Sequence, residues 1–147
     1  MVEEDGTPQA LVLRRQAKLI APDLLIAECA NILRKKVQRN ELSKEEALLA
    51  ARLLQGAEIE LLPTRSSMEA ATRIAIELDH PAYDCVYLAL AIDNGCKFVT
   101  ADERLLRKLD QSRQQGPSRT RDIVVRRCQA MMGHQWLGGD RVRTVVR

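Results

Sequence analysis

HPAYDCVYLALAIDNGCKFVTADERLL, residues His80 to Leu106, predicts a helix, a tight turn, a strand and a second helix in succession. Apolar residues at nearly every position from Tyr83 to Asn94 indicate a buried helix, and Pro81 suits its first turn. Lys97 to Thr100 is a short β-branched and aromatic run, which indicates a buried strand. A capping-box pattern that starts at Thr100 predicts the next helix. This order is typical of an α/β fold, in which sites gather at the carboxyl ends of strands.

Two acids, Asp84 and Asp102, interrupt this apolar stretch. An acid in the first turn of a helix is stabilised by the helix dipole by about 0.3–1 kcal/mol, and this needs no function. Either aspartate alone therefore has a structural explanation as good as a functional one. A third acid upstream makes the functional interpretation stronger.

The rest of the first hundred residues is mainly helical in its patterning. Glu28 lies three residues after Leu25 and four before Ile32, so it projects toward the apolar face of its helix. Capping-box patterns begin at Ser43 and at Ser66. The predicted elements are a helix over Pro8–Lys18, a helix over Asp23–Gln38, a helix from Ser43 to Gln55, a short strand over Glu58–Leu62 and a helix from Ser66 to Asp79.

The composition excludes several classes of protein. A chain of 147 residues suits one domain with its own core. The four cysteines show no CxxC spacing and the chain has only two histidines, so a zinc site is not expected. The lack of a signal peptide or a long apolar run predicts a cytoplasmic protein that does not span a membrane.

The basic charge is concentrated at the C-terminal end. Residues 1–106 carry 13 basic and 17 acidic side chains, whereas residues 107–147 carry 10 basic and 3 acidic ones. Such a tail could attract nucleic acid, but a solvated and poorly ordered end explains it equally simply. We therefore predict a domain over residues 1–109 and a basic, Arg-rich tail over residues 110–147 that could be disordered and in which only Ile123 to Val125 suggests a strand.

Glu28, Asp84 and Asp102 are candidate ligands of a metal ion. Carboxylates without an accompanying histidine or cysteine constellation favour hard divalent ions such as Mg²⁺ or Mn²⁺. The expected chemistry is phosphodiester hydrolysis, because a metal can activate water and neutralise charge on phosphate oxygens.

Three segments resemble the PIN-domain ribonucleases, most closely the VapC-type toxins of toxin–antitoxin pairs: APDLLIAECANIL, HPAYDCVYLALA and FVTADERLL. The resemblance implies an α/β, helix-rich, three-layer fold with a central parallel sheet. It also implies an acidic pocket that binds Mg²⁺ or Mn²⁺ and cleaves RNA. By motif, Glu28, Asp84 and Asp102 match the metal-binding and catalytic acids. Thr100 matches a catalytic hydroxyl residue beside the last acid, where it could hold water or phosphate. A homodimer and a VapB-like antitoxin partner are implied as well.

The chain departs from the family pattern at its start. Family members begin with an apolar strand that ends in a first catalytic Asp. No such strand precedes the first of the three segments, APDLLIAECANIL, so an N-terminally truncated fold is expected. Loss of a central strand predicts unpaired ladder groups on its neighbours and low activity. The alternative functions are therefore a catalytically impaired or inactive PIN remnant that only binds an antitoxin or nucleic acid, and a helical interaction domain with coincidental acids.

Overall fold

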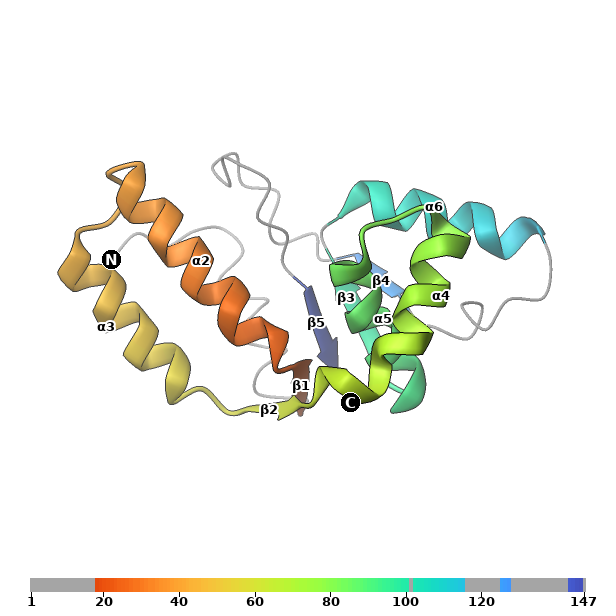
Figure 1. Ribbon diagram of the computed structural model, residues 1–147, viewed down its shortest axis with the longest axis horizontal. Coiled ribbons are helices and arrows are strands. Elements are labelled where there is room, and N and C mark those ends of the chain that lie inside the picture. Colours follow the sequence, from red (N-terminus) through yellow and green to blue (C-terminus); the bar gives the residue numbers. More distant parts are fainter. Residues whose placement is uncertain (1–17, 101, 116–124, 128–142, 147) are drawn as a thin grey trace.

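The computed structural model describes residues 18–100, 102–115, 125–127 and 143–146. Pairs of helices separate the first three strands, and a single helix follows the third (Figure 1). The elements are β1 (Leu19–Pro22), α2 (Leu24–Gln38), α3 (Lys44–Gln55), β2 (Ile59–Leu62), a 3₁₀ turn (Thr64–Ser67), α4 (Met68–Leu78), α5 (Ala82–Asp93), β3 (Lys97–Thr100), α6 (Glu103–Gln115), β4 (Val125–Arg127) and β5 (Arg143–Val146).

The five strands form one sheet in the order β2-β1-β5-β3-β4. β1 pairs with β2, and β3 pairs with β4, in parallel. The α/β fold with parallel pairing is therefore confirmed. β5 lies between the two parallel pairs and is antiparallel to both of its neighbours, so the whole sheet is mixed rather than parallel.

β5 gives the sheet a central strand that the sequence analysis did not predict. All four residues of β5 pair with β3, but only Val145 and Val146 pair with β1, opposite Ile20 and Leu19. The sequence analysis predicted that strands next to the missing central strand would have unpaired backbone groups. This prediction is wrong where β5 pairs with β1 and β3. A four-residue segment in an arginine-rich region has too little pattern to be recognised as a strand. Of the strand predicted over Ile123–Val125, only Val125 lies in β4, and the rest of it, like residues 8–17 of the predicted first helix, lies outside the described residues.

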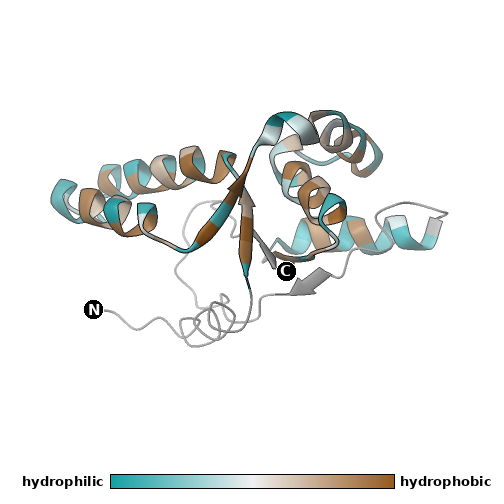
Figure 2. Ribbon diagram, turned by 90° about the horizontal axis from the view of Figure 1, so that it is seen from below, coloured by the Kyte–Doolittle hydropathy of each residue, from teal (hydrophilic) through white to brown (hydrophobic). Residues whose placement is uncertain are grey.

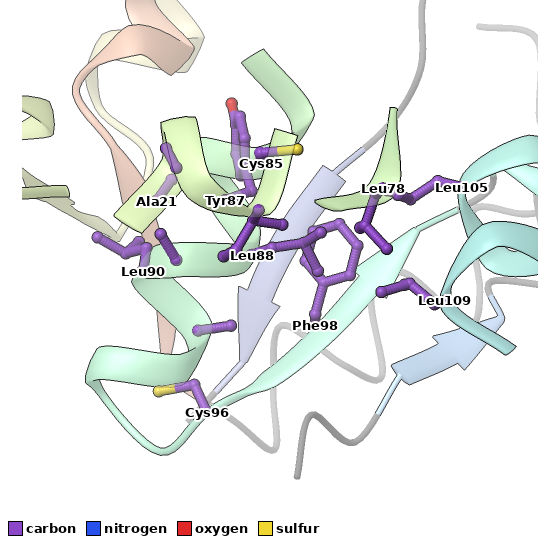
Figure 3. Packing of buried hydrophobic residues seen from close by; sticks show 14 of the residues in the cluster. Ala21, Leu78, Cys85, Tyr87, Leu88, Leu90, Cys96, Phe98, Leu105 and Leu109 are labelled. Atoms are coloured by element: carbon purple, nitrogen blue, oxygen red, sulfur yellow. The ribbon is translucent and has the colours of Figure 1, made fainter. Parts of the chain in front are cut away.

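Helix α5 is the centre of the core. It contacts α4 as well as β1, β3 and β5, which explains why it is apolar on nearly every side. Leu88 of α5 points toward Phe98 of β3, and Leu78, Leu105 and Leu109 surround the same ring (Figure 3). Burial on this scale fixes α5 and the end of β3 relative to each other.

Helices α2 and α3 form a hairpin that extends from the β1–β2 side of the sheet (Figure 1). The predicted capping box of α3 is confirmed, because the Ser43 hydroxyl accepts from the Glu46 N–H and the Glu46 carboxylate accepts from the Ser43 N–H. Neither helix has a buried residue, and hydrophobic and hydrophilic residues alternate along both (Figure 2). The hairpin is therefore held mainly by its own contacts.

Two other predicted capping boxes are wrong. Helix α4 begins at Met68 after the 3₁₀ turn, and the Ser66 hydroxyl donates to the Pro63 carbonyl instead of capping the helix. At α6 the cap is Asp102 rather than Thr100.

In the described part of the chain, no helix combines the length and the apolar character that crossing a bilayer requires.

Candidate metal centre

The junction between α4 and α5 brings His80 and Asp84 together. Asp79 ends α4 in the left-handed conformation (φ 46°), and the His80 N–H donates to the Ala75 carbonyl at 3.0 Å. Together with the bond from Asp79 N–H to the Ile76 carbonyl, this is a Schellman-type end. Pro81 then leads into α5, whose first turn carries Asp84. The chain turns sharply here, so that His80 Nε2 lies 2.7 Å from Asp84 Oδ2.

Asp102 is oriented by capping the next helix. Its Oδ1 accepts from the N–H groups of Arg104 at 2.9 Å and Leu105 at 3.2 Å. Its own N–H donates to the Thr100 hydroxyl oxygen at 3.1 Å. With Oδ1 directed at the helix, Oδ2 lies 3.7 Å from His80 Nε2. Thr100 therefore fixes the backbone of the acid that follows β3.

His80, Asp84 and Asp102 form one buried cluster of possible ligands. One atom from each lies within 4.8 Å of the other two. Their side chains are 0%, 1% and 4% exposed. Two carboxylates this close together are costly to bury unless positive charge accompanies them. Oxygen and nitrogen donors around one small space are thus a donor set that fits a divalent metal ion.

Glu28 reaches α5 one turn further along. Its Oε2 accepts a hydrogen bond from the Tyr87 hydroxyl at 2.6 Å, and Tyr87 lies three residues after Asp84, on the same side of the helix. Glu28 is half-buried and does not belong to the compact cluster of the described residues. The structure therefore brings Asp84 and Asp102 together and places Glu28 beside the same helix. The metal-binding roles of all three remain predictions.

Sequence reasoning missed His80. The chain was expected to hold its metal with carboxylates alone, whereas an imidazole lies between the two aspartates. The available signal was the spacing of four residues between His80 and Asp84, which brings side chains together on a helix. That rule could not be applied with Pro81 in between, because His80 precedes the helix rather than belonging to it.

The electrostatic effect of the cluster extends to Cys85. Burial, and secondly the negative charge of Asp84, raise the pKa of the Cys85 thiol to about 12, against an opposing effect of Lys108.

On the hairpin side, Asp23 accepts from the Thr64 N–H at 3.1 Å and from its hydroxyl. The Thr64 hydroxyl is the main cause that lowers the pKa of Asp23. Asp23 therefore links the start of α2 to the turn before α4.

An α/β fold with two aspartates and a histidine gathered where β3 ends defines a class: α/β proteins with a carboxylate-rich site at the carboxyl edge of the sheet. The family model of the PIN domain matches residues 3–111, and the chain therefore belongs to the PIN domain family. PIN domains are generally nucleases that act on RNA or other nucleic acids, typically with divalent metal ions. A comparison with curated proteins found no match.

Proposed function

We propose that this chain is a Mg²⁺- or Mn²⁺-dependent endoribonuclease that acts as the toxin of a VapBC-like toxin–antitoxin pair in the cytoplasm. One observation carries the proposal. Asp84 and Asp102 come from separate elements of a PIN domain, and their carboxylates meet within one buried cluster. Structural acids at helix starts have no reason to converge in this way.

In this proposal Asp84, Asp102 and Glu28 hold the ion. Asp84 is fixed by the first turn of α5, and Asp102 by its cap on α6. Thr100 acts through its bond to the Asp102 N–H, so it is a positioning residue. A bound divalent ion would supply activation of water and neutralisation of the charge that develops on the scissile phosphate.

A VapB-like antitoxin and a homodimer belong to the same proposal. Support comes from apolar side chains that are exposed in the single chain, among them Leu53 at 69%, Met68 at 72% and Ile76 at 76%. Exposed apolar surface of this kind is typical of protein–protein contacts. These residues lie on two separate elements, α3 and α4, which suits two different partners.

The second candidate is an inactive PIN protein that only binds an antitoxin or nucleic acid. It is favoured by the burial of both aspartates, because RNA must come close to the metal ligands to be cleaved. With side chains only 1% and 4% exposed, neither carboxylate is open to a phosphate group in this structure.

Cleavage of a structured RNA by the purified chain distinguishes these candidates. Asp84→Asn keeps the size of the side chain and removes its charge. We expect metal-dependent cleavage by the wild type and a loss of about 100-fold or more in the variant. Asp93→Asn is the matched control, because Asp93 is an exposed acid on the same helix. Equal cleavage by Asp84→Asn, or none by the wild type with either ion, contradicts the proposal.

A further inference from the structure

His80 is held rigidly by its backbone. It follows the left-handed Asp79, donates its N–H to Ala75, and precedes the proline that leads into α5. Lys108 of α6 contacts both the carbonyl and the carboxylate of Asp79, with Nζ 3.6 Å from Oδ2. Three helices therefore fix this turn.

Within the described part of the chain, the polar contacts of the His80 ring are with Asp84 and Asp102. Its side chain is 0% exposed, and Nε2 lies 2.7 Å from Asp84 Oδ2 and 3.7 Å from Asp102 Oδ2. Its other nitrogen, Nδ1, has no hydrogen-bond partner among the described residues. An imidazole buried only to support the fold would be expected to bond through both nitrogens. The polar interactions of this ring are instead directed toward the two carboxylates.

The spacing of the three atoms suits a single ion. Around an octahedral ion with bonds of about 2.1 Å, neighbouring ligand atoms lie roughly 3.0 Å apart and opposite ones roughly 4.2 Å apart. His80 Nε2 lies 2.7 Å from Asp84 Oδ2 and 3.7 Å from Asp102 Oδ2, and one ligand atom from each of the three residues lies within 4.8 Å of the other two. Shifts of less than about 1 Å would therefore place all three around one such ion.

We propose that His80 is a direct nitrogen ligand of the metal centre, and that the centre therefore prefers a divalent first-row transition ion such as Mn²⁺ over Mg²⁺. The inference rests on the metal site of the proposed function and specifies the ion that it takes. Mg²⁺ is held by oxygen ligands, whereas the first-row transition ions also bind imidazole nitrogen, with an affinity that rises from Mn²⁺ to Cu²⁺. An imidazole added to the carboxylates of Asp84, Asp102 and Glu28 thus separates ions that an all-carboxylate pocket would accept equally.

The test is pulsed electron paramagnetic resonance of Mn²⁺ bound to the full chain, grown with natural or ¹⁵N-labelled histidine. The sequence contains only His80 and His134, so His134→Gln leaves His80 as the single imidazole. We expect a nitrogen modulation that changes with the isotope in the wild type and in His134→Gln, and that disappears in His80→Gln. The comparison of isotopes in the first two proteins requires no change at His80, so it does not depend on the folding of that variant.

Metal affinity gives a second measurement. We expect His80→Gln to weaken Mn²⁺ binding by about tenfold or more, while Mg²⁺ binding changes much less. Bound Mn²⁺ without an isotope-sensitive modulation overturns the inference, as does a failure to bind Mn²⁺.

RNA cleavage keeps the two proposals separate. Metal-dependent cleavage that Asp84→Asn abolishes, without nitrogen modulation, refutes only the role of His80. Nitrogen modulation without cleavage refutes only the nuclease function.

Discussion

Helix α5 has 12 residues, and the two helices of the α2–α3 hairpin have 15 and 12, but their environments are opposite. Seven of the twelve residues of α5 are buried, including Asp84, whereas neither helix of the hairpin has a buried residue. Two of the proposed metal ligands, Asp84 and Asp102, are therefore built into the core. Glu28, the third, is carried by a helix that the core scarcely covers. The difference teaches that one half of the site is buried in the core, whereas the other half is fixed by a few polar contacts and by the packing of Leu24 and Leu25 at the start of α2.

Those polar contacts can be identified. The Tyr87 hydroxyl donates to Glu28 at 2.6 Å, and Asp23 at the start of α2 accepts from Thr64. Both contacts join the hairpin to the part of the molecule that holds the aspartates. The predictions below compare the two regions, beginning with the largest expected effect.

Packing should dominate stability in the core and contribute little on the hairpin. Phe98→Ala removes a ring with 0% exposure and is expected to lower the free energy of unfolding by about 3–5 kcal/mol. Leu53→Ala on α3, where the side chain is 69% exposed, should change it by less than about 0.5 kcal/mol. Urea unfolding monitored by circular dichroism measures both. Similar losses in the two variants would mean that the hairpin is packed against something in solution.

The link between Tyr87 and Glu28 should have a smaller effect that is specific to one tyrosine. Tyr87→Phe removes a hydrogen bond to a charged group, and we expect a loss of about 1.5 kcal/mol in the free energy of unfolding. Tyr83→Phe is the control, because this other tyrosine of the chain is 65% exposed, and its loss should stay below about 0.5 kcal/mol. If the two variants unfold alike, the hydroxyl does not anchor the hairpin.

The pH dependence of the free energy of unfolding allows the two regions to be compared, because each contains a cysteine whose pKa is raised. The pKa of Cys85 is raised from 9.0 to about 12 by burial and by Asp84. Above pH 9 the unfolded chain therefore releases this proton while the folded chain keeps it. The stability contributed by the neutral thiol is thus complete below pH 9 and declines as pH rises toward 12.

Unfolding of wild type and Cys85→Ala between pH 8 and pH 10.5 measures this effect. The difference in free energy of unfolding should narrow above pH 9 by up to about 1.4 kcal/mol per pH unit. The corresponding difference between wild type and Cys29→Ala should narrow less, because Cys29 lies half-buried on α2. Burial, and secondly the charge of Glu28, also raise the pKa of the Cys29 thiol. A gap that stays constant for Cys85→Ala would show that the thiol ionises equally in both states.

Much of the fold could be predicted because local patterns and packing agree there. The capping box of Ser43 and Glu46, the apolar run of α5 and the short strand β3 each specify one structure. The convergence of Asp84 and Asp102 follows from the same reasoning, since both lie where helices begin beside the end of β3.

The failures occur where tertiary contacts decide. β1 is only four residues long and β5 lies in an arginine-rich segment, so each is a strand only because the sheet offers it partners. Thr100 was expected to cap α6, but the carboxylate of Asp102 does so. His80 joins the cluster through a turn whose geometry the spacing of residues does not reveal.

Binding of Mn²⁺, followed by the loss of the free-ion resonance, tests most directly whether the core holds a metal centre. We predict one Mn²⁺ per wild-type chain, an affinity lowered by about tenfold or more in Asp84→Asn and in Asp102→Asn, and a smaller loss in Glu28→Gln. Glu45→Gln, an exposed acid in the first turn of α3, should bind like the wild type. If the two aspartate variants bind Mn²⁺ as tightly as Glu45→Gln does, the buried cluster is not a metal site.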